Sequence, residues 1–239
     1  MSNIIKLAID IGHNVKFDSG AVGIKREDSL NFEVGSKLMK KCSSVGIIVI
    51  DCTPKNPISH GDSLSKRVLA ANNGGADYFI SIHHNACSGG YGTEILCYPE
   101  ERAENFAKTI LPEIVKLGFR NRGVKFRRDL YVLNKTKMPA ILIECAFCDS
   151  EIDMKNYNMK SMAEAIFVGI CKALNIKVTS EVTVAKEEVA DNGIYHTVVA
   201  GDTIWALTRK YGVTLHRIIE LNNIKDPNII YPGQRLRVK

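Results

Sequence analysis

Short apolar runs alternate with amphipathic stretches along the first 174 residues of the chain. The runs that favour strands are 4–11, 46–52, 77–85, 93–99, 130–134 and 140–145. The stretches with apolar side chains at helical spacing are 28–44, 63–72, 101–117 and 161–174. Unbroken apolar strands that take turns with helices are typical of parallel strands covered on both faces. The pattern therefore predicts an α/β fold, with a twisted, largely parallel sheet flanked by helices.

The pattern changes after Leu174. Residues 176–193 contain no aromatic residue and show no hydrophobic period, which is typical of a linker. Beyond them the chain reads as strand, helix, helix and strand, with turn residues between these elements. We therefore expect a main domain at 1–175, a linker at 176–193 and a small βααβ domain at 194–239.

Composition and charge narrow the class of protein. An apolar content of 45% with 24% charged residues is typical of a globular chain. The net charge of +6 favours an acidic partner, but no nucleic-acid recognition motif accompanies it, so a nucleic-acid partner is not expected. No apolar run approaches ~18 residues, which argues against membrane insertion. The first residues lack a basic leader and a cleavage site, so we expect synthesis in the cytoplasm without a signal peptide.

Cysteine usage indicates reduced thiols. The seven cysteines are an odd number and are scattered through apolar segments, unlike a disulfide framework. Cys145 and Cys148 form one CxxC pair without a second pair. Core packing is therefore a better interpretation of this pair than a redox or metal role.

Polar side chains at the ends of three predicted strands suggest a metal site. His13 follows the first strand, His83 and His84 end the third, and Glu144 lies in a later one, while Glu27 precedes the first helix. Ligands of open α/β sheets bind at the carboxyl ends of strands. Each residue alone is more often hydrogen-bonded or solvated, but their coincidence favours a shared site. Two histidines and one carboxylate leave zinc a position for water, and a further carboxylate can transfer protons.

The two adjacent histidines cannot easily share one ion. Successive side chains of a strand point to opposite faces, so one of His83 and His84 is expected to be a ligand and the other to hydrogen-bond elsewhere. The alternation of side chains along the strand does not say which of the two histidines is the ligand. The chain has no HExxH motif, which excludes the helix-borne zinc peptidase site, and imidazole ligands argue against calcium.

Several motifs together resemble a known family. In order and spacing, IDIGHN, GIKREDSLN, SLSKRVLAANNGGADYFISIHHNA, RGVKFRRDLYVL and MPAILIECAF resemble the zinc-dependent N-acetylmuramoyl-L-alanine amidases of the amidase-3 family over residues 4–174. The resemblance implies Zn²⁺ ligands at His13, Glu27 and His83, because the family pattern Ser-Ile-His-x-Asn leaves His84 variable. It also implies a catalytic acid/base at Glu144 and hydrolysis of the amide between N-acetylmuramic acid and L-alanine in peptidoglycan.

Some positions depart from the family pattern or lie beside it. Asn14 stands where the family often has glycine, and it tolerates the left-handed backbone. Ala146-Phe147 and Asp149-Ser150 replace the usual Gly-Phe and Ser-Asn, which changes the expected shape of that loop. Arg67 and Asn72 are expected to be structural, and His60 to lie at the surface. The basic segment 116–137, with eight Lys/Arg and one acid, is most simply a solvated face; the alternative is a patch that meets anionic wall polymer or the carboxylates of the peptide stem.

The last 45 residues resemble a LysM module, a βααβ unit that binds N-acetylglucosamine-containing glycans. YHTVVAGDTIWALTRKYGV, IIELNNI and IIYPGQRLRV carry the resemblance. It implies a sugar groove whose residues we expect to be Asp202, Thr203, Ile204, Ile229 and Ile230. Trp205, the only tryptophan, shares the apolar helical spacing and is expected in the core, whereas His196 and His216 are not expected to contribute.

Taken together, the sequence predicts a zinc amidase that cleaves peptidoglycan and is anchored by LysM, most simply a phage endolysin that acts on the wall after release. A host autolysin or a mother-cell lysin would use the same chemistry. A glycan-binding wall protein without activity and a zinc peptidase of the stem peptide are the alternatives from other classes. The bacterial peptidoglycan and its muropeptides are the expected partner, and the sequence carries no indication of oligomeric state.

Overall fold

A computed structural model describes residues 4–15, 18–155, 157–177, 193–199, 201–222, 224, 230–231 and 233–239 of the chain. The chain divides into two compact units, Met1–Thr183 and Val184–Lys239. Most of the predicted linker 176–193 lies outside the described residues, so the predicted domain boundaries stay predictions. Each unit is described by itself.

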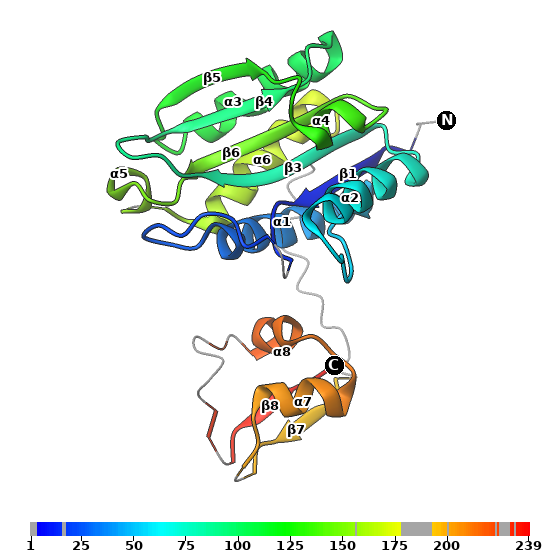
Figure 1. Ribbon diagram of the computed structural model, residues 1–239, viewed down its shortest axis with the longest axis vertical. Coiled ribbons are helices and arrows are strands. Elements are labelled where there is room, and N and C mark those ends of the chain that lie inside the picture. The colour runs from blue at the N-terminus through cyan, green and yellow to red at the C-terminus, as the bar shows by residue number, and fades with distance from the viewer. Residues whose placement is uncertain are drawn as a thin grey trace. The chain divides into compact units, whose positions relative to one another are not determined.

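The first unit is a six-stranded sheet flanked by helices (Figure 1). The strands are β1 (Lys6–Ile11), β2 (Ile48–Asp51), β3 (Tyr78–Asn85), β4 (Thr93–Cys97), β5 (Asn121–Phe126) and β6 (Ala140–Phe147). The helices are α1 (Glu27–Ser44), α2 (His60–Gly74), α3 (Glu101–Val115), α4 (Tyr131–Lys135), α5 (Glu151–Met154) and α6 (Met159–Ala173). The strand order is β2-β1-β3-β6-β4-β5, with β4 antiparallel to β6 and every other pair parallel. The predicted α/β fold with a largely parallel sheet is confirmed.

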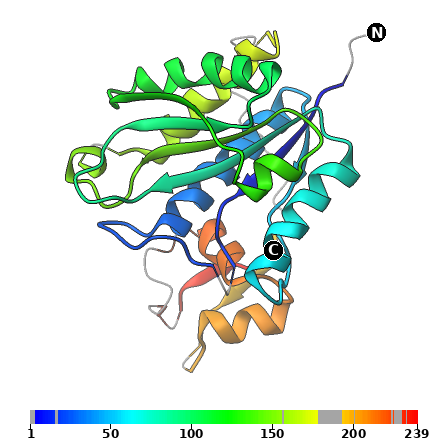
Figure 2. The same ribbon diagram turned by 45° about the horizontal axis from the view of Figure 1, so that its top comes forward.

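Helices cover both faces of this sheet (Figure 2). On one face, Ile9, Ile80 and Ile143 belong to a large core with side chains of α1, α3 and α6. On the other face, Phe79 and Leu142 belong to a smaller core with side chains of α2 and α4. Neighbouring residues of a strand thus enter different cores, as the alternation of a strand requires.

Local sequence signals begin and end the helices. Ser59 precedes α2 and accepts a hydrogen bond from the backbone N–H of Asp62, and Gly75 ends α2 in the left-handed conformation. Asn158 caps α6 in the same way as Ser59, through the N–H groups of Lys160 and Ser161. These caps satisfy backbone groups that a helix terminus leaves without a partner.

The predicted strand at 130–134 is wrong. These residues belong to the turn and short helix α4, in which the Asn134 N–H donates to the Leu130 carbonyl at 2.9 Å. Val132 and Leu133 are both buried against α2, and two adjacent residues can pack together in this way on a helix but not on a strand. Periodicity does not distinguish a short strand from a helical turn over the five residues 130–134.

Strand β5 was not predicted, because its exposed, Lys/Arg-rich sequence lacks the apolar run of a buried strand.

The second unit has the predicted strand, helix, helix, strand order. It consists of β7 (Tyr195–Thr197), α7 (Ile204–Tyr211), α8 (Leu215–Asn222) and β8 (Arg235–Arg237), and β7 pairs antiparallel with β8. Its core is formed by Val198, Ile204, Leu207, Ile218, Leu236 and Val238. Trp205 is not in this core: it is 62% exposed, because Ile204 and Leu207 occupy the buried face of α7. The expectation of a core tryptophan is therefore wrong.

The thiols largely follow the prediction of reduced, buried cysteines. All seven are free, and six of them, including Cys145 and Cys148, are buried, whereas Cys87 is exposed. Burial raises the pKa of Cys148 to about 11, which keeps it a protonated thiol at neutral pH. Among the described residues, no helix is long and apolar enough to cross a membrane.

Candidate metal centre

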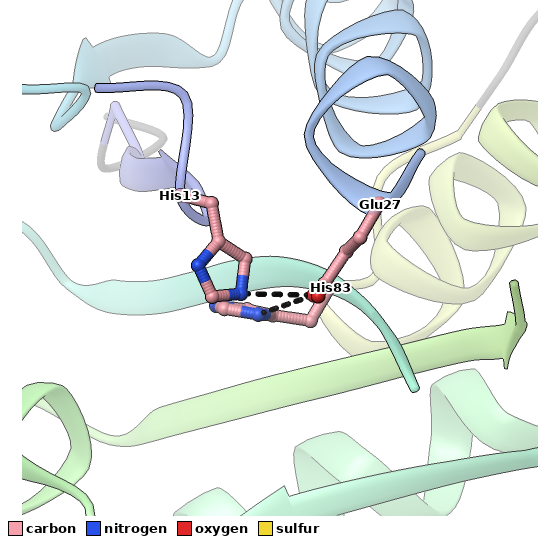
Figure 3. A group of neighbouring side chains, drawn as sticks. All are labelled: His13, Glu27 and His83. Atoms are coloured by element: carbon pink, nitrogen blue, oxygen red, sulfur yellow. Dashed lines mark hydrogen bonds and ion pairs between the residues drawn. The ribbon is translucent and has the colours of Figure 1, made fainter. Parts of the chain in front are cut away.

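Three of the predicted site residues converge at one end of the sheet (Figure 3). His13 follows β1, His83 lies in β3, and Glu27 is the first residue of α1. Oε1 of Glu27 lies 3.0 Å from Nε2 of His13 and 3.1 Å from Nδ1 of His83. One potential ligand atom from each residue lies within 4.8 Å of the other two. The structure thus brings together residues that are up to 70 positions apart in the chain.

The donor set fits zinc. Ligand atoms ~2.0–2.1 Å from a tetrahedral zinc ion lie roughly 3.3 Å from one another, close to the two distances from Glu27. Two imidazole nitrogens and one carboxylate oxygen are the usual ligands of hydrolytic zinc sites with an open position. Calcium and magnesium prefer sets of oxygen ligands, so they fit this group less well.

The backbone around His13 is built for close approach. His13 and Asn14 both have left-handed backbones, with φ of 59° and 60°. Asn14 thus adopts the left-handed conformation that was expected at a position where the family often has glycine. A Cβ atom on Gly12 would lie 2.2 Å from Nε2 of His83. Only glycine at this position allows β1 to pass so near the His83 ring, and the left-handed residues then turn His13 back toward it.

Asp18 is a site residue that the sequence did not reveal. Its Oδ1 accepts a hydrogen bond from Nδ1 of His13, the ring nitrogen that faces away from Glu27. A carboxylate in this position fixes the tautomer and the orientation of a metal-binding histidine. Asp18 lies in a loop without a hydrophobic period, and its spacing from His13 is not a recognised pattern, so no signal marked it.

His84 faces the opposite side of β3 from His83. Its Nδ1 donates to Oδ1 of Asn31 at 2.7 Å, and its Nε2 accepts from the Tyr157 hydroxyl at 2.5 Å. The amide of Asn31 donates to the Gly12 carbonyl at 3.1 Å, which fixes its oxygen as the acceptor for His84. Burial lowers the pKa of His84 to about 3. The side chain is therefore a neutral, fully hydrogen-bonded group and not part of the cluster of His13, Glu27 and His83.

Glu144 stands directly beside His83 in the sheet. The two residues are partners in the parallel pairing of β3 with β6, so their side chains share a face. Its Oε2 is buried and has no hydrogen-bond partner among the described residues. Burial raises the pKa of Glu144 to about 7, although the charge of His83 acts in the opposite direction. A carboxyl group with this pKa can both accept and donate a proton near neutral pH.

Charge around the cluster favours a bound cation. Burial lowers the pKa of His13, but hydrogen bonds and charge from Glu27 and Asp18 outweigh this effect and raise the pKa to about 9. Burial raises the pKa of Glu27, but hydrogen bonds from His13 and His83 outweigh it and hold this pKa well below its usual range. The carboxylates thus stabilise positive charge at this point, either a proton on His13 or a metal ion that displaces it.

Arg67 and Asn72 have the structural roles expected of them. Arg67 is buried, forms an ion pair with Asp10, and donates to the carbonyls of Ile11 (2.6 Å) and His13. It therefore holds the turn that carries His13. Asn72 donates from its amide to the Lys135 carbonyl at 3.1 Å and so joins α2 to the end of α4. His60 has a side chain that is 60% exposed, as expected for a surface residue.

In the second unit, the predicted sugar-binding residues fall into different environments. Thr203 caps α7, Ile204 is buried, and Asp202 accepts hydrogen bonds from His196 (2.7 Å) and from the Val199 N–H (2.9 Å). Ile230 is half-buried at the edge of the small core. Ile229 lies outside the described residues, as does the side chain of His216. His196 thus supports the turn at Asp202, and a role in glycan binding for any of these residues stays a prediction.

Comparisons with known proteins agree with both units. The N-acetylmuramoyl-L-alanine amidase family (Amidase_3) matches residues 7–175, and the LysM domain matches residues 196–239. An uncharacterised 38.4 kDa protein of Clostridium perfringens is 32% identical over 98% of this chain and 69% of its own length. The endolysin of Bacillus phage SPP1 is 32% identical over 79% of this chain and 72% of its own length. The solved CwlD amidase of Clostridioides difficile, in complex with the GerS lipoprotein, covers 72% of this chain and 100% of the CwlD chain, with 27% identity and a TM-score of 0.66.

Proposed function

Because this chain belongs to the N-acetylmuramoyl-L-alanine amidase family and ends in a LysM domain, we propose that it is a zinc-dependent hydrolase of peptidoglycan. The bond that it cleaves joins N-acetylmuramic acid to L-alanine. The convergence of His13, Glu27 and His83 on one point supports this proposal most directly.

In this proposal, His13, Glu27 and His83 hold the metal ion. Zinc bound there would polarise the scissile carbonyl and lower the pKa of a water molecule to ~7. Asp18 holds the His13 ring in the tautomer that leaves Nε2 available, and Arg67 holds the backbone turn on which His13 lies. Gly12 keeps the space that the His83 ring occupies.

Glu144 is the proposed proton carrier. It lies beside His83, and its buried Oε2 has no hydrogen-bond partner among the residues that the structure describes, so it is free to accept a proton from the attacking water. It would then donate that proton to the nitrogen of the departing L-alanine, so the amide breaks into a free carboxyl group and a free amine. A bound dication would lower the pKa of Glu144 from its value of about 7, which favours the base form before attack.

The LysM domain is the proposed anchor. Tethering a hydrolase to an insoluble polymer raises the local concentration of scissile bonds without altering the chemistry. We propose N-acetylglucosamine-containing glycan as its ligand, with Asp202, Thr203, Ile204, Ile229 and Ile230 as the residues to test.

The biological role proposed is that of a phage endolysin, which is made in the cytoplasm and acts on the bacterial cell wall after release. The 32% identity with the endolysin of Bacillus phage SPP1 supports this role. A bacterial autolysin or mother-cell lysin is the second candidate, and the similarity to a solved amidase from a bacterium, Clostridioides difficile, supports a host origin. Both candidates share one reaction.

Digestion of purified cell walls tests the reaction. The zinc-loaded chain should lower the turbidity of the walls, and mass spectrometry of the fragments should show new L-alanine N-termini. Glu144→Ala should abolish both signals while keeping the metal. Wall binding without lysis by the unsubstituted chain would favour a glycan-binding protein, and cleavage elsewhere in the stem would favour a peptidase.

A further inference from the structure

A row of charged side chains continues from the metal centre across the sheet. His83 is the register partner of Glu144, and Glu144 is in turn the register partner of Glu94 on β4. Partners directly opposite one another in a sheet share a face. The next strand, β5, contributes Arg122 and Lys125, which both form ion pairs with Glu94. The row therefore runs from the metal ligand to the basic edge strand.

Glu94 fixes the two cations in place. It is 5% exposed, and its Oε2 accepts from Nε of Arg122 at 2.7 Å and from Nζ of Lys125 at 2.6 Å. The β4–β5 register shifts between Thr93 and Ile95, so that Arg122 and Gly123 together face Glu94. Gly123 has a φ of +84°, which few other residues adopt, and this irregularity lets Arg122 reach Glu94 from the edge strand.

The cations keep binding capacity toward solvent. The side chains of Arg122 and Lys125 are 27% and 44% exposed. Arg122 bonds to Glu94 through its Nε alone. Its two terminal Nη groups make no hydrogen bond to any described residue, so they can still bind a ligand. Its guanidinium also lies 4.8 Å from the centre of the Phe147 ring, which restricts its movement. Arg122 and Lys125 both pair with the single carboxylate of Glu94, so this group of three side chains carries one excess positive charge. Their N–H donors are already oriented by these ion pairs.

The position of Glu144 decides which part of a substrate meets these cations. The group that protonates the leaving amine must lie on the side of the departing peptide. Glu144 lies between His83 and Glu94 in the row, so in the proposed reaction the departing peptide would extend toward β5 and the glycan would extend away from it. In that orientation, Arg122 and Lys125 would face an acidic part of the peptide and not the sugar.

We propose that Arg122 and Lys125, held by Glu94, form a subsite that binds a carboxylate of the stem peptide and so contributes to substrate specificity. This inference rests on the proposed amidase function. It assigns a role to part of the basic segment 116–137: these two cations bind substrate, whereas Lys116 pairs with Glu113 outside the row. The partly buried setting of Arg122 fits a ligand attached to the scissile amine better than a long anionic wall polymer.

The test uses two soluble muramoyl tripeptides that differ only in their second residue. One has a free α-carboxylate, and the other has a carboxamide at the same position. Removing the cations alone would leave Glu94 buried and unpaired, so the informative variant carries Glu94→Gln, Arg122→Gln and Lys125→Gln together. Lys116→Gln is the matched control for loss of charge from the same segment, and Arg122→Lys keeps the charge but removes the planar fork.

For the full-length, zinc-loaded chain, we expect a lower KM for the carboxylate substrate than for the carboxamide. The triple variant should raise KM for the carboxylate substrate by roughly 10- to 100-fold, with little change in kcat or in the carboxamide reaction. Arg122→Lys should have a KM for the carboxylate substrate between those of the wild type and the triple variant. Lys116→Gln should have the KM of the wild type. The melting temperature and the metal content of each variant show that it is folded.

Three results would overturn the inference. They are equal KM values of the wild type for both substrates, equal losses on both substrates in the triple variant, and a loss seen only on intact walls that disappears after removal of their anionic polymers. The last result would assign the cations to that polymer. If the wild type cleaves neither tripeptide nor walls, the proposed amidase function itself fails, and that outcome is distinct from the other three.

Discussion

His83 and His84 are adjacent in β3, yet their imidazoles have different partners on different faces of the sheet. Nδ1 of His83 lies 3.1 Å from Glu27, whereas the ring of His84 bonds to Asn31 and Tyr157. One histidine thus belongs to the candidate metal centre, and its neighbour belongs to the buried polar network behind it.

Substitution of the two histidines should therefore have different effects. His83→Ala should abolish zinc binding, as should His13→Ala, because each removes one of three ligands. His84→Ala should retain zinc but lower the free energy of unfolding by about 1–3 kcal/mol, since Asn31 and Tyr157 lose a buried partner. Metal analysis of the purified variants, with urea unfolding, measures both effects. Retention of zinc by His83→Ala together with its loss from His84→Ala would contradict the assignment.

His84 should also make the protein sensitive to acid. Burial lowers its pKa to about 3 in the folded chain, against an ordinary value of 6.5. Above pH 6.5 both states hold neutral imidazole, so the group has no pH effect. As the pH falls from 6.5 toward 3, the unfolded chain gains a proton that the folded chain excludes, and stability decreases by up to ~1.4 kcal/mol per pH unit.

Urea unfolding at pH 7 and pH 5, in the presence of a chelator, measures this effect. Other groups also titrate over this range, so the comparison is with His84→Gln, which keeps a donor and an acceptor but does not titrate. The variant should lose less stability than wild type between the two pH values. An equal loss in both proteins would show that His84 does not contribute.

Asp18→Asn should weaken zinc binding without removing a ligand. The asparagine cannot stabilise positive charge on His13 and can present its N–H group to Nδ1, so the ring is held less firmly in the useful tautomer. Loss of such a partner typically lowers metal affinity by about 10- to 100-fold. Competition with a chromogenic chelator measures the affinity. The control is Asp28→Asn. Asp28 is an acidic residue at the start of α1 that pairs with Arg26, and the variant should bind zinc as tightly as the wild type does.

Gly12→Ala should displace His83 and lose zinc. The added Cβ would lie 2.2 Å from Nε2 of the His83 ring, so either the ring or β1 must move. Gly61→Ala is the matched control, because a Cβ on Gly61 in the first turn of α2 meets nothing within 4 Å. It should keep full zinc binding. Equal zinc content in the two variants would show that the close approach at Gly12 is not needed.

A chain that ends at Asn175 should retain catalysis but lose attachment. The first unit has its own two cores, and the candidate metal centre lies within it. Cleavage of soluble muropeptides should therefore be unchanged, while binding to intact walls should fall by roughly 100-fold or more. Sedimentation with purified walls measures the binding. Equal sedimentation of the shortened and full-length chains would remove the anchoring role of the LysM domain.

The residues that converge at the candidate site could be predicted from sequence because most of them end strongly apolar strands. The run AILIEC makes Glu144 conspicuous, and FISIHHN does the same for the histidine pair. The choice between His83 and His84 came only from family resemblance, since alternation along a strand establishes that they differ but not which one meets Glu27.

Features that depend on the partner of a residue were not predictable. Asp18 becomes part of the site only because the left-handed turn at His13 brings Nδ1 toward it. Strand β5 is stabilised by its pairing with β4 and by the ion pairs of Glu94, and its own sequence is polar and exposed. Trp205 has the right spacing for the core, but a small domain fills that space with Ile204 and Leu207.

The reversal of direction between β6 and β4 has an evolutionary consequence. β4 and β5 form a parallel pair that joins the rest of the sheet only along β6, at the edge far from β1 and α1. Insertions or exchanges in this outer pair would leave the candidate ligands His13, Glu27 and His83 in place. A lineage could therefore diversify the proposed peptide-binding surface while it inherits an unaltered candidate metal centre.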